Sequence, residues 1–328
     1  MFVNLCNFTE KMQLQTLVPI QPLNNKINYH SKIVSVGSCF AVNMAQRFKQ
    51  YQFVNTLNPL GILFHPQAIS TLVQYAVNNK VFTEADVFLH NEIWSCFHAH
   101  SDLNELEQED IVEALNQRII DFRSNIEQAS HFIITLGTAW VYRFIETNEI
   151  VANCHKIPQQ KFQKELLSIE DCQKAIFQIE ASLRQINPNI QIIYTISPVR
   201  HIKDGFVENQ RSKAHLIAAL HQHLQENQSL NYYFPSYEII MDELRDYRFY
   251  GKDLIHPNEL AVDYIWESFV QNCIDPEILS TMKKVDEVQK GLAHRPFNPY
   301  TESHQQFLDK LALKLDDLLE QYPFMNFR

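Results

Sequence analysis

The chain has 328 residues, of which 45% are hydrophobic and 20% charged, and this composition is typical of a folded protein rather than a disordered one. Its 28 basic and 38 acidic residues give a net charge of −10, which argues against nucleic acid as a partner because phosphate binding needs clustered Lys and Arg. Six widely spaced cysteines without a C-x-x-C pair, no secretory pattern at the N-terminus and no apolar run of about 18 residues predict a cytoplasmic protein without a membrane span.

The first regular elements predicted along the chain are a strand, a tight turn and a helix. An extended lead-in covers residues 1–30. Alternating β-branched residues then predict a buried strand over 32–36, and apolar residues at helical spacing predict a helix over 41–48. Ser38 lies in the turn, at a strand end and a helix N-terminus, where α/β proteins bind ligands and amides favour negative charge. Ser is also a preferred N-cap residue, so this stretch alone fits capping as well as catalysis.

The rest of the chain alternates apolar strands with amphipathic helices. We expect strands at 52–57, 131–137, 190–196 and 231–234, helices at 67–78, 106–129, 169–186, 210–227, 239–247 and 259–273, and hairpins at 87–98 and 140–155. This order predicts an α/β fold with a mostly parallel five-stranded sheet, helices on both faces and the hairpins as insertions. We expect one domain over residues 31–275 and a C-terminal helical extension, packed on it, over 276–328.

A second stretch that carries chemistry is Asp253-Leu254-Ile255-His256-Pro257, in a predicted loop just before a helix. A D-x-x-H spacing on a turn lets the carboxylate reach an imidazole nitrogen, which fixes the tautomer and stabilises the imidazolium that forms when the other nitrogen takes a proton from a serine. Taken alone, the spacing also fits an Asp-capped turn with a solvent-exposed His. The pair of stretches, Ser38 early and Asp253 with His256 late, predicts a catalytic triad at one edge of the sheet.

These stretches carry a family resemblance. Gly37-Ser38-Cys39-Phe40-Ala41 spells the motif of the GSCFA family and resembles the first block of the SGNH, or GDSL-like, hydrolases, whereas Asp253 to Pro257 resembles their last block. The resemblance covers about residues 30–270 and includes the stretches 58–61, 135–140, 151–156 and 197–201, together with Asn209, Ser212 and Lys213. It implies a flavodoxin-like three-layer sandwich and ester hydrolysis with Ser38 as nucleophile.

The resemblance also implies an oxyanion site, and here the chain departs from the SGNH pattern. Those enzymes usually place an Asn two residues after the glycine that ends the third block's strand, and this chain has Ala139 there. We therefore expect the amides of Ser38 and Gly61 as donors, with Asn153 or the Thr138 hydroxyl as the third. Residues predicted to line the substrate pocket are Trp140, His155, Arg200 and His201.

The expected reaction is hydrolysis of an O-acyl ester by Ser38, His256 and Asp253, with a small molecule or an acetylated carbohydrate as substrate and no cofactor or metal. One alternative is an O-acyltransferase with the same triad, since hydrolysis and transfer share one acyl-enzyme. Another is a catalytically weak ligand-binding module with the same fold. Two further readings carry less weight. Cys39 is either a thiol nucleophile or a packed side chain, and Cys96, His98 and His100 at i, i+2 and i+4 are either a metal site or a polar strand face.

Overall fold

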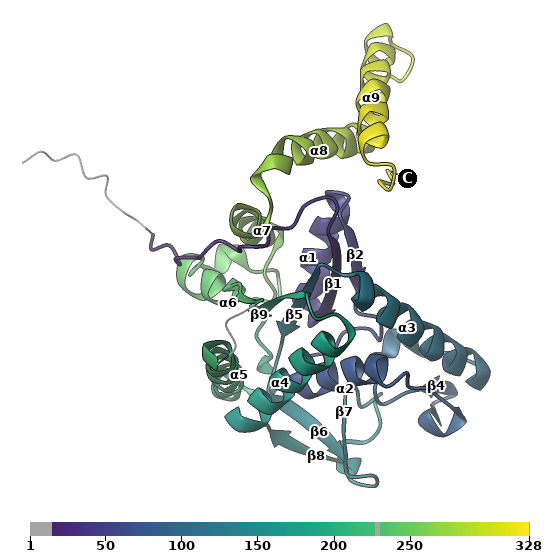
Figure 1. The fold of residues 1–328 in the computed structure, drawn as a ribbon, viewed down its shortest axis with the longest axis vertical. Helices are drawn as coiled ribbons and strands as arrows, with labels where there is room; N and C mark the ends of the chain where they lie inside the picture. Colours follow the sequence, from purple (N-terminus) through teal and green to yellow (C-terminus); the bar gives the residue numbers. More distant parts are fainter. Residues whose placement is uncertain (1–14, 227–229, 328) are drawn as a thin grey trace, which may run out of the picture.

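The computed structural model describes residues 15–226 and 230–327. Its centre is a parallel sheet with the strand order β10-β9-β5-β1-β2, and helices cover both faces (Figure 1). The strands of this sheet are β1 Lys32–Gly37, β2 Val54–Leu57, β5 His131–Leu136, β9 Gln191–Ile196 and β10 Asn231–Tyr233. The predicted fold class, a five-stranded parallel α/β sandwich, is confirmed.

The helices divide between the two faces because successive residues of a strand point to opposite sides. Val34 and Val36 of β1 belong to the same core cluster as α2, α3, α4 and α5, whereas Ile33 belongs to the cluster built with α1, α7 and α8. The helices are α1 Cys39–Gln50, α2 Pro66–Val77, α3 Gln108–Gln128, α4 Ile169–Ile186, α5 Phe206–Glu226, α6 Ser236–Glu238, α7 Glu259–Cys273, α8 Leu279–Ala293 and α9 Glu302–Gln321.

Two insertions decorate the sheet. The first is the expected hairpin, β3 Phe88–His90 and β4 Ile93–Ser95, with Asn91 and Glu92 at positive φ in its turn. The second is a three-stranded antiparallel sheet in the order β7-β6-β8, made of β6 Trp140–Phe144, β7 Glu149–Val151 and β8 Phe162–Leu166. The sequence pattern predicted only two of these strands, because the polar run Gln163-Lys164-Glu165 in β8 breaks any apolar alternation.

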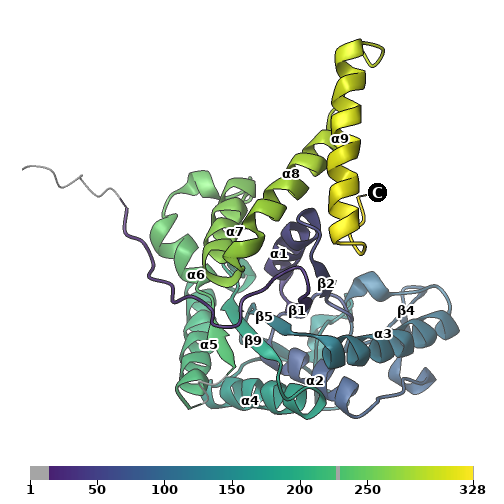
Figure 2. The ribbon, with the colours of Figure 1, turned by 45° about the horizontal axis from the view of Figure 1, so that its top comes forward.

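Two other segments differ from the predicted elements. The helix expected at 239–247 is a short α6 that continues as one π-helical turn over Ile239–Glu243 and a 3-10 turn over Tyr247–Phe249. At the C-terminus, α8 leads away from the sheet and α9 packs against α8, so the two helices form an arm that projects from the sandwich (Figures 1 and 2). The lead-in runs as an extended strap across α7, and Ile27 makes a parallel bridge with Ile274.

Candidate active site

The turn after β1 is held tightly from both neighbouring strands. Gly37 has a φ of +136°, and a Cβ at this position would lie 2.2 Å from the carbonyl oxygen of Thr135 on β5, so only glycine fits. From the other side, the side-chain oxygen of Asn58 accepts a hydrogen bond from the Gly37 amide at 2.8 Å. These contacts fix the backbone that presents Ser38 at the carboxyl edge of the sheet.

Ser38 occupies the N-cap position of α1, but its side chain makes no capping hydrogen bond. Its hydroxyl oxygen is buried and has no hydrogen-bond partner within residues 15–226 and 230–327. A buried hydroxyl without a partner costs free energy that a capping bond would recover. The capping interpretation of this serine therefore fails, and the hydroxyl remains available for chemistry.

Asp253 and His256 form a short, charge-assisted contact. The Oδ2 atom of Asp253 lies 2.6 Å from Nδ1 of His256, and its Oδ1 atom accepts hydrogen bonds from the amides of Ile255 and His256. The two amides and the imidazole lower the pKa of Asp253 to about 2, so the carboxylate is ionised at neutral pH. Both side chains are about half exposed. The carboxylate thus orients the imidazole and leaves its Nε2 atom directed away from Asp253.

The segment after β9 links this loop to the edge that carries Ser38. The Nη2 atom of Arg200 donates a hydrogen bond to the carbonyl oxygen of Leu254 at 2.9 Å. Since β9 and β1 run parallel in one sheet, the segment after β9 and the turn at Ser38 lie at the same carboxyl edge. The loop of Asp253 and His256 is therefore at that edge too, although Ser38 Oγ makes no hydrogen bond to His256.

His201 lies next to Ser38. A Cβ built on Gly137, the residue after β5, would be 3.2 Å from Nε2 of His201 and 3.2 Å from Cβ of Ser38. The imidazole packs edge-on against Phe64, and the backbone amide of His201 donates to the side-chain oxygen of Asn209. The Nε2 atom of the ring is buried without a hydrogen-bond partner in the described part of the chain. Burial, with the charges of Lys213 and His256 nearby, lowers the pKa of His201 to about 4. The ring is therefore neutral at pH 7.

A buried lysine, Lys213, lies next to these residues, and the sequence alone assigned it no role. The Nζ atom of Lys213 on α5 donates to the carbonyl oxygens of Gly137 and Ser197, each at 2.7 Å. Burial lowers the pKa of Lys213 to about 7. The lysine thus ties the ends of β5 and β9 together beneath the site. The family resemblance includes Lys213 without giving it a role, and a charged residue at helical spacing by itself predicts only a helix face.

Three of the predicted oxyanion donors already have partners. The Ser38 amide donates to the carbonyl of Thr135 at 3.1 Å, and the Gly61 amide donates to the carbonyl of Asn58 at 2.8 Å. The Thr138 hydroxyl shares a hydrogen bond with Ser212 at 2.9 Å and accepts one from the amide of Trp140. In this arrangement none of these groups is free to meet a developing oxyanion, and the expectation built on them is corrected.

Asn153 and His155 lie elsewhere. Asn153 accepts a hydrogen bond from the His155 amide, and Nε2 of His155 donates to the carbonyl of Cys96 at 2.7 Å. Both residues line a cavity of about 620 Å³ whose lining does not include Ser38. Trp140 is also fixed by the scaffold: its indole N–H donates to Glu208 and Lys164 lies over its ring. None of these three residues makes a hydrogen bond to the Ser38 hydroxyl in the described ranges.

The premise of the metal alternative is also wrong. Strand β4 ends at Ser95, so Cys96, His98 and His100 lie in a turn and do not alternate along one strand face. Across the described residues, no group of three or more His, Cys, Asp and Glu side chains is arranged to hold a metal ion. His100 instead accepts from the amide of Asp102 and packs against Gly61. For Cys39, burial raises the pKa of the thiol, which disfavours the nucleophilic thiolate.

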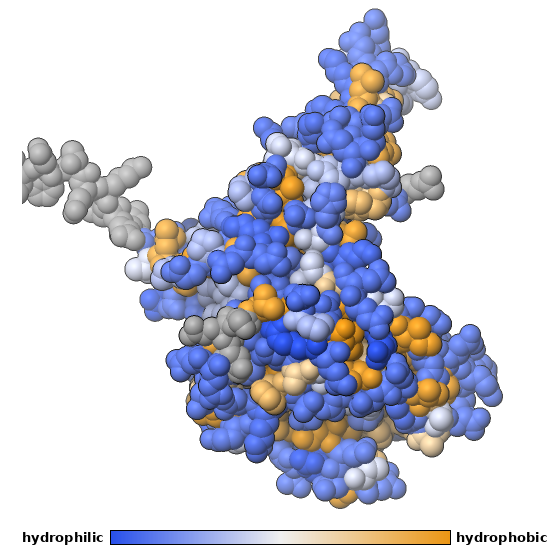
Figure 3. Space-filling model, in the orientation of Figure 1, coloured by the Kyte–Doolittle hydropathy of each residue, from blue (hydrophilic) through white to orange (hydrophobic). Residues whose placement is uncertain are grey.

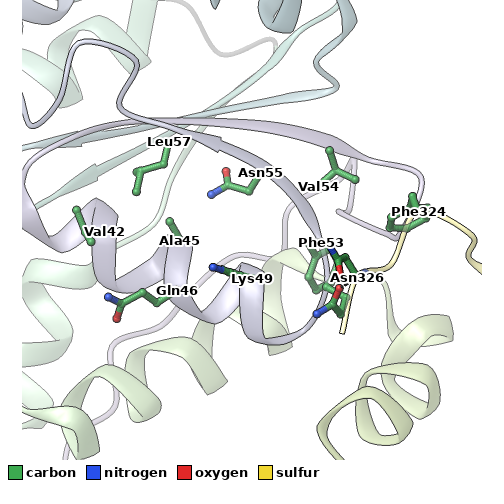
Figure 4. A pocket seen from close by; sticks show the side chains of 11 residues that line it. Val42, Ala45, Gln46, Lys49, Phe53, Val54, Asn55, Leu57, Phe324 and Asn326 are labelled. Carbon is green, nitrogen blue, oxygen red and sulfur yellow. Dashed lines mark hydrogen bonds between the residues drawn. The ribbon is translucent and has the colours of Figure 1, made fainter. Parts of the chain in front are cut away.

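Another cavity, of about 550 Å³, lies beside the edge strand β2, between α1 and the C-terminal segment (Figure 4). Val42, Ala45 and Leu57 line one end of it, and Phe324 and Asn326 line the other. Ser38 is not among its lining residues, so this cavity is separate from the candidate site. None of the helices in residues 15–226 and 230–327 combines the length and hydropathy that crossing a bilayer requires.

Comparison with known proteins identifies a family for this chain. Among solved structures, the fold is similar to an acetyl xylan esterase from the rumen bacterium Butyrivibrio proteoclasticus, at 14% identity and a TM-score of 0.33. That match covers 81% of this chain and 66% of the esterase chain. No curated protein matches the sequence. Residues 285–328 match the C-terminal domain of GSCFA domain proteins, and residues 32–269 match the GSCFA family. Because the latter match spans most of the chain, the protein belongs to the GSCFA family.

Proposed function

We propose that the protein is a serine-dependent ester hydrolase of the SGNH type. In this reaction Ser38 Oγ attacks the ester carbonyl while Nε2 of His256 takes the hydroxyl proton, and the same proton then passes to the leaving alcohol. Water attacks the resulting acyl-enzyme, again with His256 as base, and releases the acid. Asp253 holds the imidazole and stabilises its protonated form.

The observation that carries this proposal is the 2.6 Å contact between Asp253 and His256, on a loop tied to the edge that presents Ser38. A surface ion pair of this kind has little value for stability, whereas a carboxylate that fixes an imidazole is what a general base requires. Ser38 is fully buried and not bonded to His256. The hydroxyl must therefore become accessible and meet His256 in the substrate complex, as catalytic hydrogen bonds often do.

An O-acyl ester of a small molecule or carbohydrate is the substrate class we propose, on the family resemblance alone. Arg200 contributes by positioning in this proposal. Its guanidinium holds the carbonyl of Leu254 and packs over the ring of Tyr250, which fixes the loop that carries Asp253 and His256.

The test is Ser38→Ala, assayed with short p-nitrophenyl esters. We expect kcat to fall on the order of 10⁴-fold or more, since the nucleophile of a triad acts as a unit with its base. The matched control is Ser35→Ala, which removes a buried hydroxyl within β1 that is bonded to Asn55. Hydrolysis that Ser38→Ala leaves unchanged would rule out this nucleophile and the proposed function with it.

A further inference from the structure

The backbone amides expected to meet the oxyanion, those of Ser38 and Gly61, already have acceptors. Besides the amides of Ser38 and Gly61, those of Gly137 and Thr138 are also engaged, since both donate to the carbonyl of Phe64 at 2.8 and 3.0 Å. A tetrahedral intermediate without a donor at its oxygen loses the largest electrostatic contribution to acyl transfer. Side-chain donors next to Ser38 can supply this contribution in place of these four amides.

Two side chains beside Ser38 have buried polar nitrogen atoms without a hydrogen-bond partner in the described residues. These are Nδ2 of Asn58 and Nε2 of His201. They approach from opposite sides in the strand order, because Asn58 follows β2 and His201 follows β9, while Ser38 follows β1. Buried nitrogen atoms without partners are rare and costly in folded proteins, so two of them at one nucleophile need an explanation.

Every other polar group of Asn58 is occupied. Its amide donates to the carbonyl of Ser35, its carbonyl accepts from Gly61, and its side-chain oxygen accepts from Gly37 at 2.8 Å. The residue also has a positive φ of 42°, a conformation that costs free energy outside glycine but that Asn tolerates. The side-chain N–H group is thus rigidly held next to the residue that precedes Ser38, and it is the one group of Asn58 left to bind something else.

The surroundings of His201 favour donation over proton acceptance. Burial, with Lys213 and His256 nearby, lowers its pKa to about 4. An imidazole of such low basicity is a poor general base at neutral pH, but when neutral with its proton on Nε2 it donates a hydrogen bond. Asp204, the nearby acid, forms an ion pair with Lys164 and has no hydrogen bond to His201 in the described ranges.

We propose that the side-chain nitrogens of Asn58 and His201 form the oxyanion site, each donating one hydrogen bond to the ester oxygen that becomes negative when Ser38 attacks. The inference rests on the proposed function and adds two catalytic residues to it. No bond to Asn58 or His201 forms or breaks; both nitrogens keep their protons and stabilise the charge until the alcohol leaves. The Asn that SGNH enzymes usually have at the position of Ala139, after β5, is then replaced by Asn58 after β2 and His201 after β9.

The experiment measures kcat and KM for p-nitrophenyl acetate with Asn58→Asp, His201→Leu and His201→Gln. Asn58→Asp keeps the acceptor for the Gly37 amide and replaces the free donor by a carboxylate oxygen, a change of charge that the control Asn55→Asp shares. We expect Asn58→Asp and His201→Leu each to lower kcat on the order of 100-fold, with KM changed much less, because oxyanion donors act in the transition state. His201→Gln retains a donor and should recover at least tenfold of the loss.

Asn55→Asp and His221→Leu are the matched controls. Asn55 on β2 accepts from Ser35, and His221 on α5 packs on Tyr233, so both lie outside the site. Thermal melting of each variant separates a folding defect from a catalytic one. A kcat for Asn58→Asp and His201→Leu that equals wild type would overturn the inference while the proposed function stands. A His201→Gln variant as inactive as His201→Leu would also overturn it, because His201 would then act as a base.

Labelling of Ser38 by an organophosphonate provides the second measurement. The phosphonyl oxygen takes the place of the oxyanion, so both donor-deficient variants should react on the order of 100-fold more slowly than wild type. Labelling at wild-type rates in both would contradict the inference. A wild-type protein that neither hydrolyses the ester nor reacts with the phosphonate would overturn the proposed function itself, and the two failures are thus distinguishable.

Discussion

Gly37 is the residue on which the candidate site depends most directly. Its φ and the approach of the Thr135 carbonyl leave no room for a side chain, and the obstacle is backbone of the central strand β5, which cannot move aside. The glycine therefore lets β1 and β5 pair closely at the point where Ser38 is presented.

For Gly37→Ala we expect a loss of more than about 3 kcal/mol in the free energy of unfolding, measured by urea denaturation. Gly251→Ala is the comparison, because a Cβ there would meet its neighbours at ordinary distances of 3.6 and 3.7 Å. A Gly37→Ala variant as stable as Gly251→Ala would contradict the close approach of Thr135.

Lys213 gives the folded protein a pH-dependent stability. Its pKa is about 7 in the folded chain and near 10.4 when unfolded, so between these values the unfolded state binds more protons. This group therefore makes stability rise with pH from about 7 to about 10, by at most about 1.4 kcal/mol per pH unit. Below about 7 both states are protonated and the contribution no longer changes.

We expect Lys213→Met to lack this rise, so the stability difference between wild type and variant should widen from pH 7 to pH 9. Urea denaturation at several pH values measures it, and other titrating groups cancel in the difference. Lys174→Met, at a side chain that is 79% exposed, should show a constant difference. A constant difference for Lys213→Met as well would mean that the lysine titrates near its ordinary pKa.

At the level of single elements, the start of α2 shows how one histidine acts as a cap. Pro66 occupies the first turn, and Nδ1 of the buried His65 accepts a hydrogen bond from the Ala68 amide at 3.1 Å. Nε2 lies 3.2 Å from the carbonyl of Val151, to which it donates. Burial lowers the pKa of His65 to about 4, so the cap requires the neutral ring.

Acid should therefore weaken the protein through this cap. Between pH 6.5 and about 4 the unfolded His65 is protonated while the folded one is not, so stability falls as pH falls through this window. We expect His65→Asn, which keeps a capping acceptor without titrating, to lose less stability between pH 7 and pH 5 than wild type. Thermal melting checks this, with His221→Asn as the control. Equal acid sensitivity of wild type and His65→Asn would contradict the role of the neutral ring.

At the scale of the whole molecule, the carboxyl edge and the amino edge of the sheet have different roles. The carboxyl edge carries Ser38 and the loop of Asp253 and His256. The opposite edge receives the C-terminal segment after α9: Tyr322 packs on Tyr29 just before β1, and the amide of Asn326 donates to Gln52 just before β2. The hydropathy surface is largely hydrophilic in the view of Figure 3, with apolar residues gathered in places along the projecting arm.

Truncating Met325, which buries its side chain in the C-terminal segment, should lower stability without changing the rate of ester hydrolysis. Met325 is only 5% exposed, and we expect Met325→Ala to lower the free energy of unfolding by about 2 kcal/mol through the lost burial and the cavity left behind. Phe297→Ala, at a fully exposed side chain of the arm, should cost less than about 0.5 kcal/mol. Ester hydrolysis well below the melting temperature should stay at the wild-type rate in both, and a large fall in kcat for Met325→Ala would contradict the separation of the two edges.

Much of this protein follows from local sequence. The β-branched run before Gly37 and the helical spacing after Ser38 predict the strand, the turn and the helix, because side-chain periodicity determines which face is buried. The spacing of Asp253 and His256 likewise predicts a contact that a single turn closes. The edge strand β8 and the π-helical turn after α6 were missed, since neither has a strong periodic pattern.

The tertiary structure alone decided which hydrogen-bond donors and acceptors are already used. The amides of Ser38 and Gly61 already have carbonyl partners, and Asn153 lies in a different cavity. Asn58 bonds to Gly37 before Ser38, while His201 and Lys213 approach Gly137, which lies beside Ser38, from other segments. Such pairing depends on residues tens to hundreds of positions apart in the chain. Periodicity and spacing describe only near neighbours, so they predicted the fold class and the candidate triad but not the surroundings of the nucleophile.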